Sequence, residues 1–279
     1  MQSDSEDAPV DVDALVHAKE KFYFGLCIVV SVLLYAFLVR LIATGEAAGG
    51  VILVYVILGV VIYFLVKGLG LGYIRGNGVR VTGRQFPEVH AMVEQHSRRL
   101  GMEAPAVFVL QAGGVLNAFA TRFLGRNFVV VYSDILGLAT QKGERAVSFV
   151  VGHELGHIRR KHMSRRALLY PAMLVPFLGS AYSRACEYTC DQIGGALEPD
   201  GGLDGLLVLA AGRDLYTKMS STEFSRQTET ERGFFVRFAE IVSSHPHLTK
   251  RVAVFDSRPR REPELPRYAS PETFAPPAT

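Results

Sequence analysis

Two long apolar stretches near the N-terminus constrain the fold of this chain more than any other feature of its sequence. Residues 22–43 are almost continuously hydrophobic, with Arg40 near their end, and residues 51–74 are interrupted only by Lys67. A helix needs about 20 apolar residues to cross the hydrocarbon core of a bilayer. Because each stretch is long enough and only a short loop separates them, we predict a transmembrane hairpin over residues 21–75.

Two other structures can contain apolar stretches of this length. A cleaved signal peptide would have a shorter apolar core, a more basic flank and a small-residue cleavage site after it. A hairpin buried in a soluble core would show a polar face on at least one helix. The sequence fits neither pattern well, and its hydrophobic content of 49% is high for a soluble enzyme.

The positions of the cations predict how the hairpin is oriented. Short loops that are rich in lysine and arginine stay in the cytoplasm. Here the loop between the stretches carries only Glu46, and Arg40 argues weakly for the opposite orientation. The rule therefore places both termini and the remainder of the chain in the cytoplasm, with the hairpin in a bacterial inner or plasma membrane. The cations outside the hairpin are Lys19, Lys21, Arg75, Arg80 and Arg84.

Beyond the hairpin the sequence is that of a soluble domain, which we place at residues 76–257. Residues 1–20 are acidic and residues 258–279 are rich in proline and arginine, so both are predicted to be poorly ordered tails. β-Branched and aromatic residues predict strands, and apolar residues at helical spacing predict helices. The fold class is therefore a membrane-anchored α+β protein, mainly helical with a small β-sheet. The predicted strands are 106–110 and 127–133, and the predicted helices are 86–101, 144–162, 183–197, 203–220 and 230–243.

Charge and cysteine content exclude two classes of protein. The formal net charge is only +3, and no basic stretch is interleaved with aromatic residues, so no nucleic-acid partner is expected. The three cysteines are an odd number, and Cys27 lies inside an apolar stretch. That is no disulfide framework, and it fits a reducing compartment.

The sequence FVVGHELGHIRRKH, residues 149–162, contains the main candidate for a catalytic site. His153 and His157 stand four residues apart, so on a helix both imidazoles share one face and can bind one cation. Glu154 lies about 100° round the helix and can stand beside a water at that cation. This is the arrangement of HExxH zinc hydrolases, in which zinc activates the water and the glutamate transfers its proton. The alternative is a helix whose histidines are merely structural.

The residues after the motif exclude one source of the third metal ligand. The extended pattern HExxHxxGxxH requires a glycine at position 160 and a histidine at position 163, where this chain has Arg160 and Met163. His162 follows His157 by five residues, about 140° away from the metal face of a continuous helix. We therefore expect His162 to be solvated.

A later helix offers a carboxylate instead, as in the gluzincins. The stretch SRACEYTCD, residues 183–191, contains Glu187, and Asp191 lies four residues further on the same helix face. A carboxylate in that place is suited to hold a zinc-bound histidine by its other ring nitrogen. Such a pair is a weak signal by itself, because many exposed helices carry two acidic residues at this spacing.

Four motifs in the same order resemble the HtpX and CAAX prenyl endopeptidase family of membrane zinc metalloproteases, which are of gluzincin type. The resemblance runs from about residue 86 to residue 255, and the N-terminal hairpin matches the layout of bacterial HtpX. The matching pieces are NAFA at 117–120, VVGHELGH at 150–157, SRACEYTCD at 183–191 and SSHPHLTKRV at 243–252.

The resemblance implies a role for each of these motifs. It implies that His153, His157 and Glu187 bind one zinc ion, with Glu154 as general base and Asp191 behind the ligands. His245 would lie in the cleft and donate to the oxyanion of the tetrahedral intermediate. An edge strand for pairing with an extended substrate would be formed by Asn117, Ala118, Phe119 and Ala120.

The chain departs from this family in two places. Relatives insert membrane spans between the HExxH helix and the third ligand, whereas here residues 167–182 are too short to cross a bilayer as a helix. This segment follows a cluster of basic residues and either rests on anionic lipid or forms a buried helical hairpin. The second departure is Cys190, where relatives usually have a small residue. With Cys186 it flanks Glu187, so thiol ligation of the metal is a further alternative.

We therefore predict a membrane-bound zinc endopeptidase that acts on polypeptides near the bilayer, in quality control or processing of membrane-associated proteins. A CAAX-type prenyl-protein protease is the second hypothesis, because two spans cannot build the large chamber of those enzymes. A zinc-binding membrane scaffold without turnover is the third. Glu154 argues against the scaffold, since a structural zinc site does not need that carboxylate.

Overall fold

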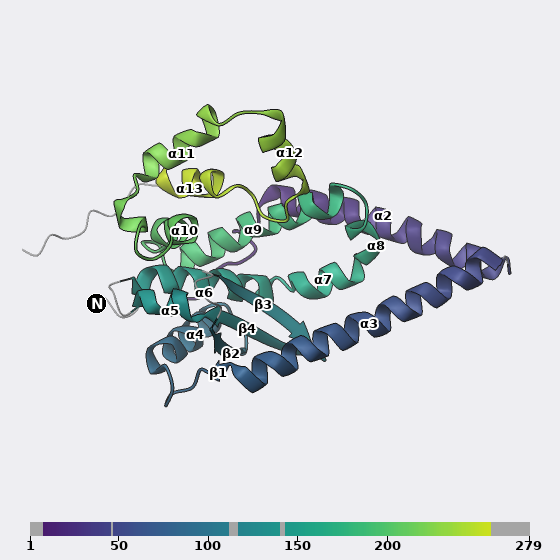
Figure 1. The fold of residues 1–279 in the computed structure, drawn as a ribbon, viewed down its shortest axis with the longest axis horizontal. Helices are drawn as coiled ribbons and strands as arrows, with labels where there is room; N and C mark the ends of the chain where they lie inside the picture. The colour runs from purple at the N-terminus through teal and green to yellow at the C-terminus, as the bar shows by residue number, and fades with distance from the viewer. Residues whose placement is uncertain (1–7, 46, 112–116, 140–142, 258–279) are drawn as a thin grey trace, which may run out of the picture.

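The computed structural model describes residues 8–45, 47–111, 117–139 and 143–257 (Figure 1). Its first two helices form a long hairpin that projects from a mainly helical domain containing a small sheet. The fold class predicted from the sequence is thus confirmed. The helices after the hairpin are α4 (Pro87–Arg99), α5 (Ser133–Ala139), α6 (Glu144–Arg159), α7 (His162–Leu168), α8 (Tyr170–Met173), α9 (Leu178–Leu197), α10 (Gly202–Ala211), α11 (Ser221–Thr230), α12 (Phe234–Val242) and α13 (Leu248–Asp256), with a 3-10 turn at Tyr216–Lys218.

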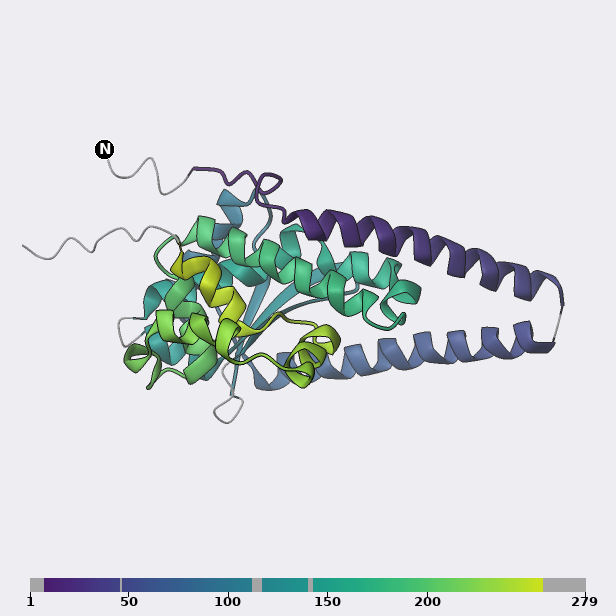
Figure 2. The ribbon, with the colours of Figure 1, turned by 90° about the horizontal axis from the view of Figure 1, so that it is seen from above.

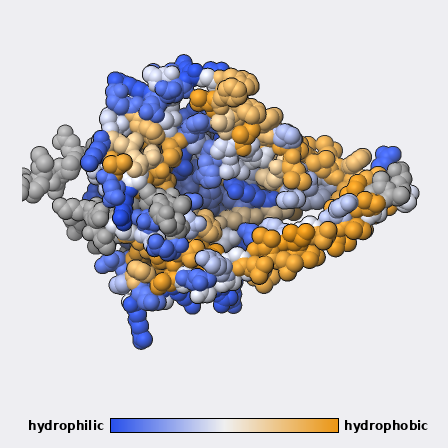
Figure 3. Space-filling model, in the orientation of Figure 1, coloured by the Kyte–Doolittle hydropathy of each residue, from blue (hydrophilic) through white to orange (hydrophobic). Residues whose placement is uncertain are grey.

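The hairpin consists of α2 (Ala18–Ala43) and α3 (Ala47–Asn77). Both helices are long and apolar enough to cross a membrane, and most of their surface is exposed. Figures 1 and 2 show that they meet at a distant tip and that their other ends reach the domain, so both ends lie on the same side of any bilayer that the hairpin crosses. The space-filling view shows apolar surface concentrated on this hairpin (Figure 3). This exposure excludes a hairpin buried in a soluble core.

The sheet contains four strands in the order β1-β2-β4-β3. Strands β2 and β4 are parallel, whereas β1 pairs with β2 and β3 pairs with β4 in antiparallel fashion. This order leaves β3 at one edge of the sheet. The strands are β1 (Val79–Arg80), β2 (Ala106–Leu110), β3 (Ala118–Phe123) and β4 (Arg126–Tyr132).

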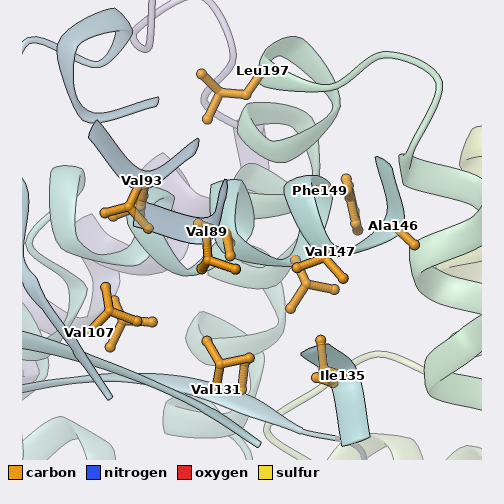
Figure 4. Packing of buried hydrophobic residues seen from close by; sticks show 14 of the residues in the cluster. Val89, Val93, Val107, Val131, Ile135, Ala146, Val147, Phe149 and Leu197 are labelled. Carbon is orange, nitrogen blue, oxygen red and sulfur yellow. The ribbon is translucent and has the colours of Figure 1, made fainter. Parts of the chain in front are cut away.

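Each face of the sheet packs against a different set of helices. Strand side chains alternate between the two faces, and β4 is buried on both because it is a central strand. On one face Val107 and Val131 pack with helices α4 and α6 (Figure 4). On the other face Phe108 and Val130 pack with Leu71 at the domain end of α3. The sheet therefore connects the membrane hairpin to the helical core.

Helices α6 and α9 cross closely, and glycines permit this. A Cβ atom on Gly152 would lie 3.0 Å from Leu197 Cδ1 and 3.3 Å from Gly194 Cα, and one on Gly194 would lie 3.0 Å from the carbonyl oxygen of Phe149. The close approach brings the HExxH face of α6 against α9. An alanine at either glycine would push the two helices apart.

His96 of α4 gives the domain a predictable acid sensitivity. It is 3% exposed, its Nε2 lies 2.9 Å from Ser148 Oγ, and burial together with the charge of Arg99 lowers its pKa to about 4. Between pH 6.5 and pH 4 the unfolded chain therefore binds the additional proton, so stability falls as the pH falls. We expect a loss of about 2–3 kcal/mol from this residue by pH 4.5.

The measurement is thermal or denaturant unfolding in detergent at pH 7.5 and pH 4.5. His96→Gln keeps a hydrogen-bonding side chain but cannot take up the proton, so its stability should depend less on pH. An equal loss in both proteins would show that His96 is protonated in the folded state or does not control the acid response.

The N-terminal segment differs from its sequence prediction. Within the predicted tail, residues 8–17 pack on the domain: Val12 is buried in the main core, and the N–H of Val10 donates to the carbonyl oxygen of Arg99. The prediction of disorder was therefore wrong for these residues. The prediction rested on the acidic composition, but Val10 and Val12 are spaced so that both reach the core. The predicted C-terminal tail, residues 258–279, lies outside the described residues.

Several helix boundaries also differ. The helix predicted over 144–162 ends at Arg159, because Lys161 adopts a left-handed conformation with φ 57°. The helix predicted over 203–220 ends at Ala211, before Gly212 with φ 83°. Both breaks redirect the chain, and the first one matters for the site described below.

The segment between the HExxH helix and α9 is neither a span nor a fully buried hairpin. Helix α8 packs against α2, and Leu169 and Ala172 are buried there beside Cys27 and Tyr182. Their opposite side is open, with Leu168 and Leu174 exposed. One side of this segment is therefore buried against the membrane hairpin, and the other side is exposed.

Candidate metal centre

Three side chains from two helices converge at the crossing of α6 and α9. His153 Nε2 and His157 Nε2 lie 3.2 Å apart, and they lie 3.4 Å and 3.3 Å from the two carboxylate oxygens of Glu187. Atoms that share one tetrahedral ion at bond lengths of about 2.0–2.2 Å are separated by about 3.3–3.6 Å. The three side chains predicted as ligands are thus placed as a zinc-sized ion requires.

A buried salt bridge lies directly behind the first imidazole. Asp191 Oδ1 lies 2.9 Å from His153 Nδ1, and Arg251 of α13 donates to both oxygens of Asp191, at 2.8 Å and 2.6 Å. All three side chains are buried. Asp191 therefore fixes His153 with its Nε2 directed at the convergence point, as its helical spacing from Glu187 suggested.

The pKa values of His153 and Glu187 indicate that positive charge between them is stabilised. Burial would lower the pKa of His153, but the hydrogen bonds to Asp191 and Glu187 outweigh it and hold that pKa at about 10. Burial would likewise raise the pKa of Glu187, but the two histidines hold it well below the ordinary value. The site therefore binds positive charge at its centre, which either a proton or a metal ion can supply.

The second imidazole is held by a chain of two further buried residues. His157 Nδ1 lies 3.0 Å from His162 Nδ1, and His162 Nε2 lies 3.3 Å from Glu20 Oε1. Burial lowers the pKa of His162 to about 4, so at neutral pH it is uncharged and can accept at one ring nitrogen while it donates from the other. This chain links the start of α2 to the candidate centre.

His162 corrects one prediction and Glu20 adds a residue that the sequence did not suggest. His162 was expected in solvent, but it is 1% exposed, because the left-handed Lys161 ends α6 and turns His162 back toward His157. Glu20 is equally buried, although it lies in the predicted acidic tail. Nothing local in the sequence marks it, since its partners stand far along the chain.

The basic cluster after the motif makes contacts within the protein, whereas the sequence suggested contact with anionic lipid. Arg160 and Arg165 donate to Glu20 Oε1 at 2.9 Å and 3.2 Å, and Arg159 donates to the carbonyl oxygen of Leu100 at 2.7 Å. These three guanidinium groups are therefore engaged within the protein. The proposed contact of this cluster with anionic lipid is not supported for them.

Glu154 lies beside the three converging side chains without joining them. It is 8% exposed and lines a cavity of about 260 Å³ that reaches the convergence point. The walls of this cavity come from α6, α7, α9, α10, α13, the loop before α13 and the start of β3. A carboxylate at the edge of such a cavity is positioned to exchange a proton with a molecule inside it.

His245 reaches the same cavity from the loop between α12 and α13. Its Nε2 lies 3.6 Å from Glu187 Oε1, its Nδ1 lies 2.9 Å from Ser244 Oγ, and its side chain is 62% exposed. The residue thus stands at the mouth of the cavity. A donor here faces whatever group lies over the converging ligands.

The segment Asn117–Ala120 lies along the cavity as expected. All four residues line it, and Ala118 begins the edge strand β3. The N–H of Tyr132 donates to the carbonyl oxygen of Asn117, so alternate residues from Asn117 onward direct their main chain to β4. Ala118 and Ala120 therefore direct theirs to the outer edge, beside the cavity.

The two cysteines near Glu187 are poor candidates for the metal. Cys190 Sγ lies 3.7 Å from His162 Nδ1, and burial raises the pKa of its thiol well above the ordinary value. Burial raises the pKa of Cys186 as well. A metal ligand must be a thiolate. Neither sulfur belongs to the group of His153, His157 and Glu187, whose three side chains already converge, so the histidine–glutamate set is favoured.

The family model described as Peptidase family M48 matches residues 83–176 and 167–258. A plastoglobule-localized chloroplastic metallopeptidase 48 of Arabidopsis thaliana is 25% identical over 209 residues, which are 65% of this chain and 59% of that protein. A protease HtpX homologue of Methanothermobacter thermautotrophicus is 30% identical over 153 residues, 53% of this chain and 57% of that protein.

A further protease HtpX homologue, from Moorella thermoacetica, is 26% identical over 222 residues, 62% of this chain and 72% of that protein. The chain spans less than two thirds of the length of the first two relatives. No solved structure matches it significantly. The family match covers the helix α6 motif, α9 and the loop that carries His245.

Proposed function

Because the chain belongs to peptidase family M48, we propose that it is a membrane-bound, zinc-dependent endopeptidase. The observation that carries this proposal is the convergence of His153, His157 and Glu187 beside the carboxylate of Glu154. Relatives that share these segments are named proteases or metallopeptidases. Two helices that are long and apolar enough to cross a bilayer support the membrane anchor.

The donor set and its hydrogen bonds support zinc as the ion. A zinc ion needs the Nε2 lone pair of each imidazole, so the proton of each ring must lie on Nδ1. This tautomer requires an acceptor beside each Nδ1. Asp191 accepts a hydrogen bond from Nδ1 of His153, and neutral His162 accepts one from Nδ1 of His157. A bound zinc ion would supply a Lewis acid that polarises the scissile carbonyl and lowers the pKa of a water.

The side chains around the ligands divide the remaining work. Glu154 accepts a proton from the water that attacks the scissile carbonyl, and then gives it to the leaving amine. His245 donates a hydrogen bond to the oxygen that gains negative charge during the attack. Its partial exposure is suitable for this role, because the donor must meet a substrate that enters from the same side.

The substrate is a polypeptide held in extended form along β3. The main-chain groups of Ala120 and the carbonyl oxygen of Ala118 face outward and can pair with it, whereas the N–H of Ala118 donates to Asn117 Oδ1. Such pairing orients the scissile bond with little sequence specificity. We place the domain in the cytoplasm on the basis of the cations that flank the hairpin. A role in quality control or processing of membrane-associated proteins follows from this position beside the bilayer.

Metal removal tests the proposal. The protein, purified in detergent, should lose casein cleavage when a chelator removes the metal and regain it when one equivalent of zinc is added. An untreated sample carried through the same dialysis is the control. A protein that binds zinc at one per chain but cleaves nothing would instead support the scaffold hypothesis.

The chain from Glu20 to His157 leads to a separate prediction for metal affinity. Removing the outer hydrogen-bond partner of a ligand typically costs about 10–100-fold in affinity. Glu20→Gln keeps the size of the side chain but removes the charge that fixes His162 and pairs with Arg160 and Arg165. We expect a zinc dissociation constant about tenfold higher, measured by competition with a chelating dye.

Cys27→Ala is the matched control for this measurement. Cys27 is a buried residue of the same helix that packs on the domain and has no link to His162. This variant should lose stability while its zinc affinity stays unchanged. If both variants weaken zinc binding equally, the effect belongs to the packing of α2 rather than to Glu20.

A further inference from the structure

A second cavity lies between the membrane helix α3 and the edge strand β3. It has a volume of about 490 Å³ and is lined on one side by residues of α3 between Gly59 and Ile74, and on the other by Phe119, Thr121 and Phe123. The α3 residues belong to a helix that is long and apolar enough to cross a membrane. The cavity therefore lies beside a segment that is apolar enough to enter a bilayer.

This cavity and the metal-site cavity flank the same strand. Side chains of β3 alternate between the two faces of the sheet: Ala118 packs in the core with α6, while Phe119 and Phe123 pack in the cluster with α3. Phe119 lines both cavities. The two cavities are thus adjacent along the outer edge of β3.

A substrate strand paired with β3 would reach both cavities. Successive side chains of any strand point to opposite faces of its sheet, and directly opposed residues on neighbouring strands lie about 4.5–5.5 Å apart. The substrate residues opposite Ala118 and Ala120 would point toward the metal side. Those opposite Phe119 and Thr121 would point into the second cavity.

The lining of the second cavity selects the chemistry of these residues. Most of its side chains are aliphatic or aromatic, among them Ile62, Val66 and Leu71. Its one cation is engaged, because Lys67 Nζ donates to Thr121 Oγ1 at 3.0 Å and lies 5.9 Å from the centre of the Tyr63 ring. An apolar side chain would gain from burial here, whereas a charged one would lose its hydration.

We propose that this cavity is a specificity site that takes large aliphatic or aromatic side chains of the substrate. In the substrate, the residues that enter this cavity alternate with the residues whose side chains face the metal. The favoured substrate is an extended segment of a membrane protein at the point where it leaves the bilayer. This inference rests on the proposed function, since it requires a polypeptide to be cleaved beside β3.

The test uses the full chain in detergent and an unbiased mixture of peptides whose cleavage sites are read by mass spectrometry. The sites cleaved should be enriched in large apolar residues at alternate positions near the scissile bond. Two peptides that differ only in leucine or alanine at the most enriched position are then compared by kcat/KM. Losing even one methylene in an apolar pocket typically costs about tenfold or more, so we expect at least about tenfold in favour of leucine.

Two glycines of α3 offer a matched pair of variants. Gly70 lines the cavity and Gly72 does not, and a Cβ atom on either one meets nothing within 4 Å. Gly70→Leu should therefore fill the cavity without disturbing the helix. We expect it to lower kcat/KM for the leucine peptide more than for the alanine peptide and so to reduce the preference for leucine, whereas Gly72→Leu should keep the wild-type preference.

Other results would overturn the inference in distinguishable ways. A profile without apolar preference, or one favouring acidic residues, would exclude this specificity site while leaving the peptidase intact. If Gly70→Leu changes the cleavage of both peptides equally, the preference for leucine persists and the cavity does not receive that side chain. If wild-type protein cleaves no peptide, the proposed function itself fails and the inference fails with it.

Discussion

Glu154→Gln is expected to lower peptidase activity by about 10²–10⁴-fold while zinc remains bound, because general acid–base catalysis contributes about that much. Glu154 lines the cavity but is not among the converging ligand atoms. Glutamine has the same size and cannot take up the proton. The measurements are kcat/KM on a peptide identified by the cleavage profile, and the zinc content per chain.

Glu144→Gln is a suitable control for this variant, since Glu144 stands exposed in the first turn of the same helix, outside the cavity. It should retain full activity. Unchanged activity in Glu154→Gln would exclude this residue as the general base. Loss of zinc together with activity would show that Glu154 holds the metal rather than the proton.

Glu187→Ala should have the largest effect on zinc affinity. Glu187 supplies the only carboxylate of the proposed ligand set, and it is 3% exposed with both oxygens directed at His153 and His157. Its removal takes away a ligand rather than the support of one. The zinc dissociation constant should therefore rise by more than the roughly 10–100-fold typical of losing an outer partner.

Glu229→Ala, at an exposed acidic position of α11, controls for the lost charge and should bind zinc normally. Metal affinity is measured by competition with a chelating dye, and folding by thermal unfolding of the metal-free proteins. If Glu187→Ala binds zinc as tightly as the wild type, Glu187 is not a ligand. Two other groups of possible ligands share His162, and they would then become candidates for the metal site. They are His157, His162 and Cys190, and Glu20, His162 and Cys186.

The parts of the site that depend on helical spacing could be predicted from the sequence. His153 and His157 share a face of α6, and Glu187 and Asp191 share a face of α9, because residues four apart on a helix are neighbours. The structure brings these two faces together through the glycines at the helix crossing. Periodicity specifies each face, and the family resemblance specified that the two faces meet.

The parts that depend on chain breaks and long-range packing could not be predicted. The expected direction of His162 assumed a continuous helix, and one residue with a left-handed backbone, Lys161, reversed that direction. Arg251 and Glu20 meet the site only through the packing of α13 and α2. No local pattern distinguishes such residues from ordinary surface charges.

The burial of Glu20 affects how this protein can be studied in solution. A shortened chain that starts after the hairpin would be the convenient form for crystallisation, yet it would lack the carboxylate that His162 and two arginines contact. It would also expose the apolar surface of Tyr182 and Cys186 that α2 covers. Kinetic constants measured on such a fragment would describe a different ligand environment. Helix α2 is thus part of the candidate metal centre as well as of the apolar hairpin.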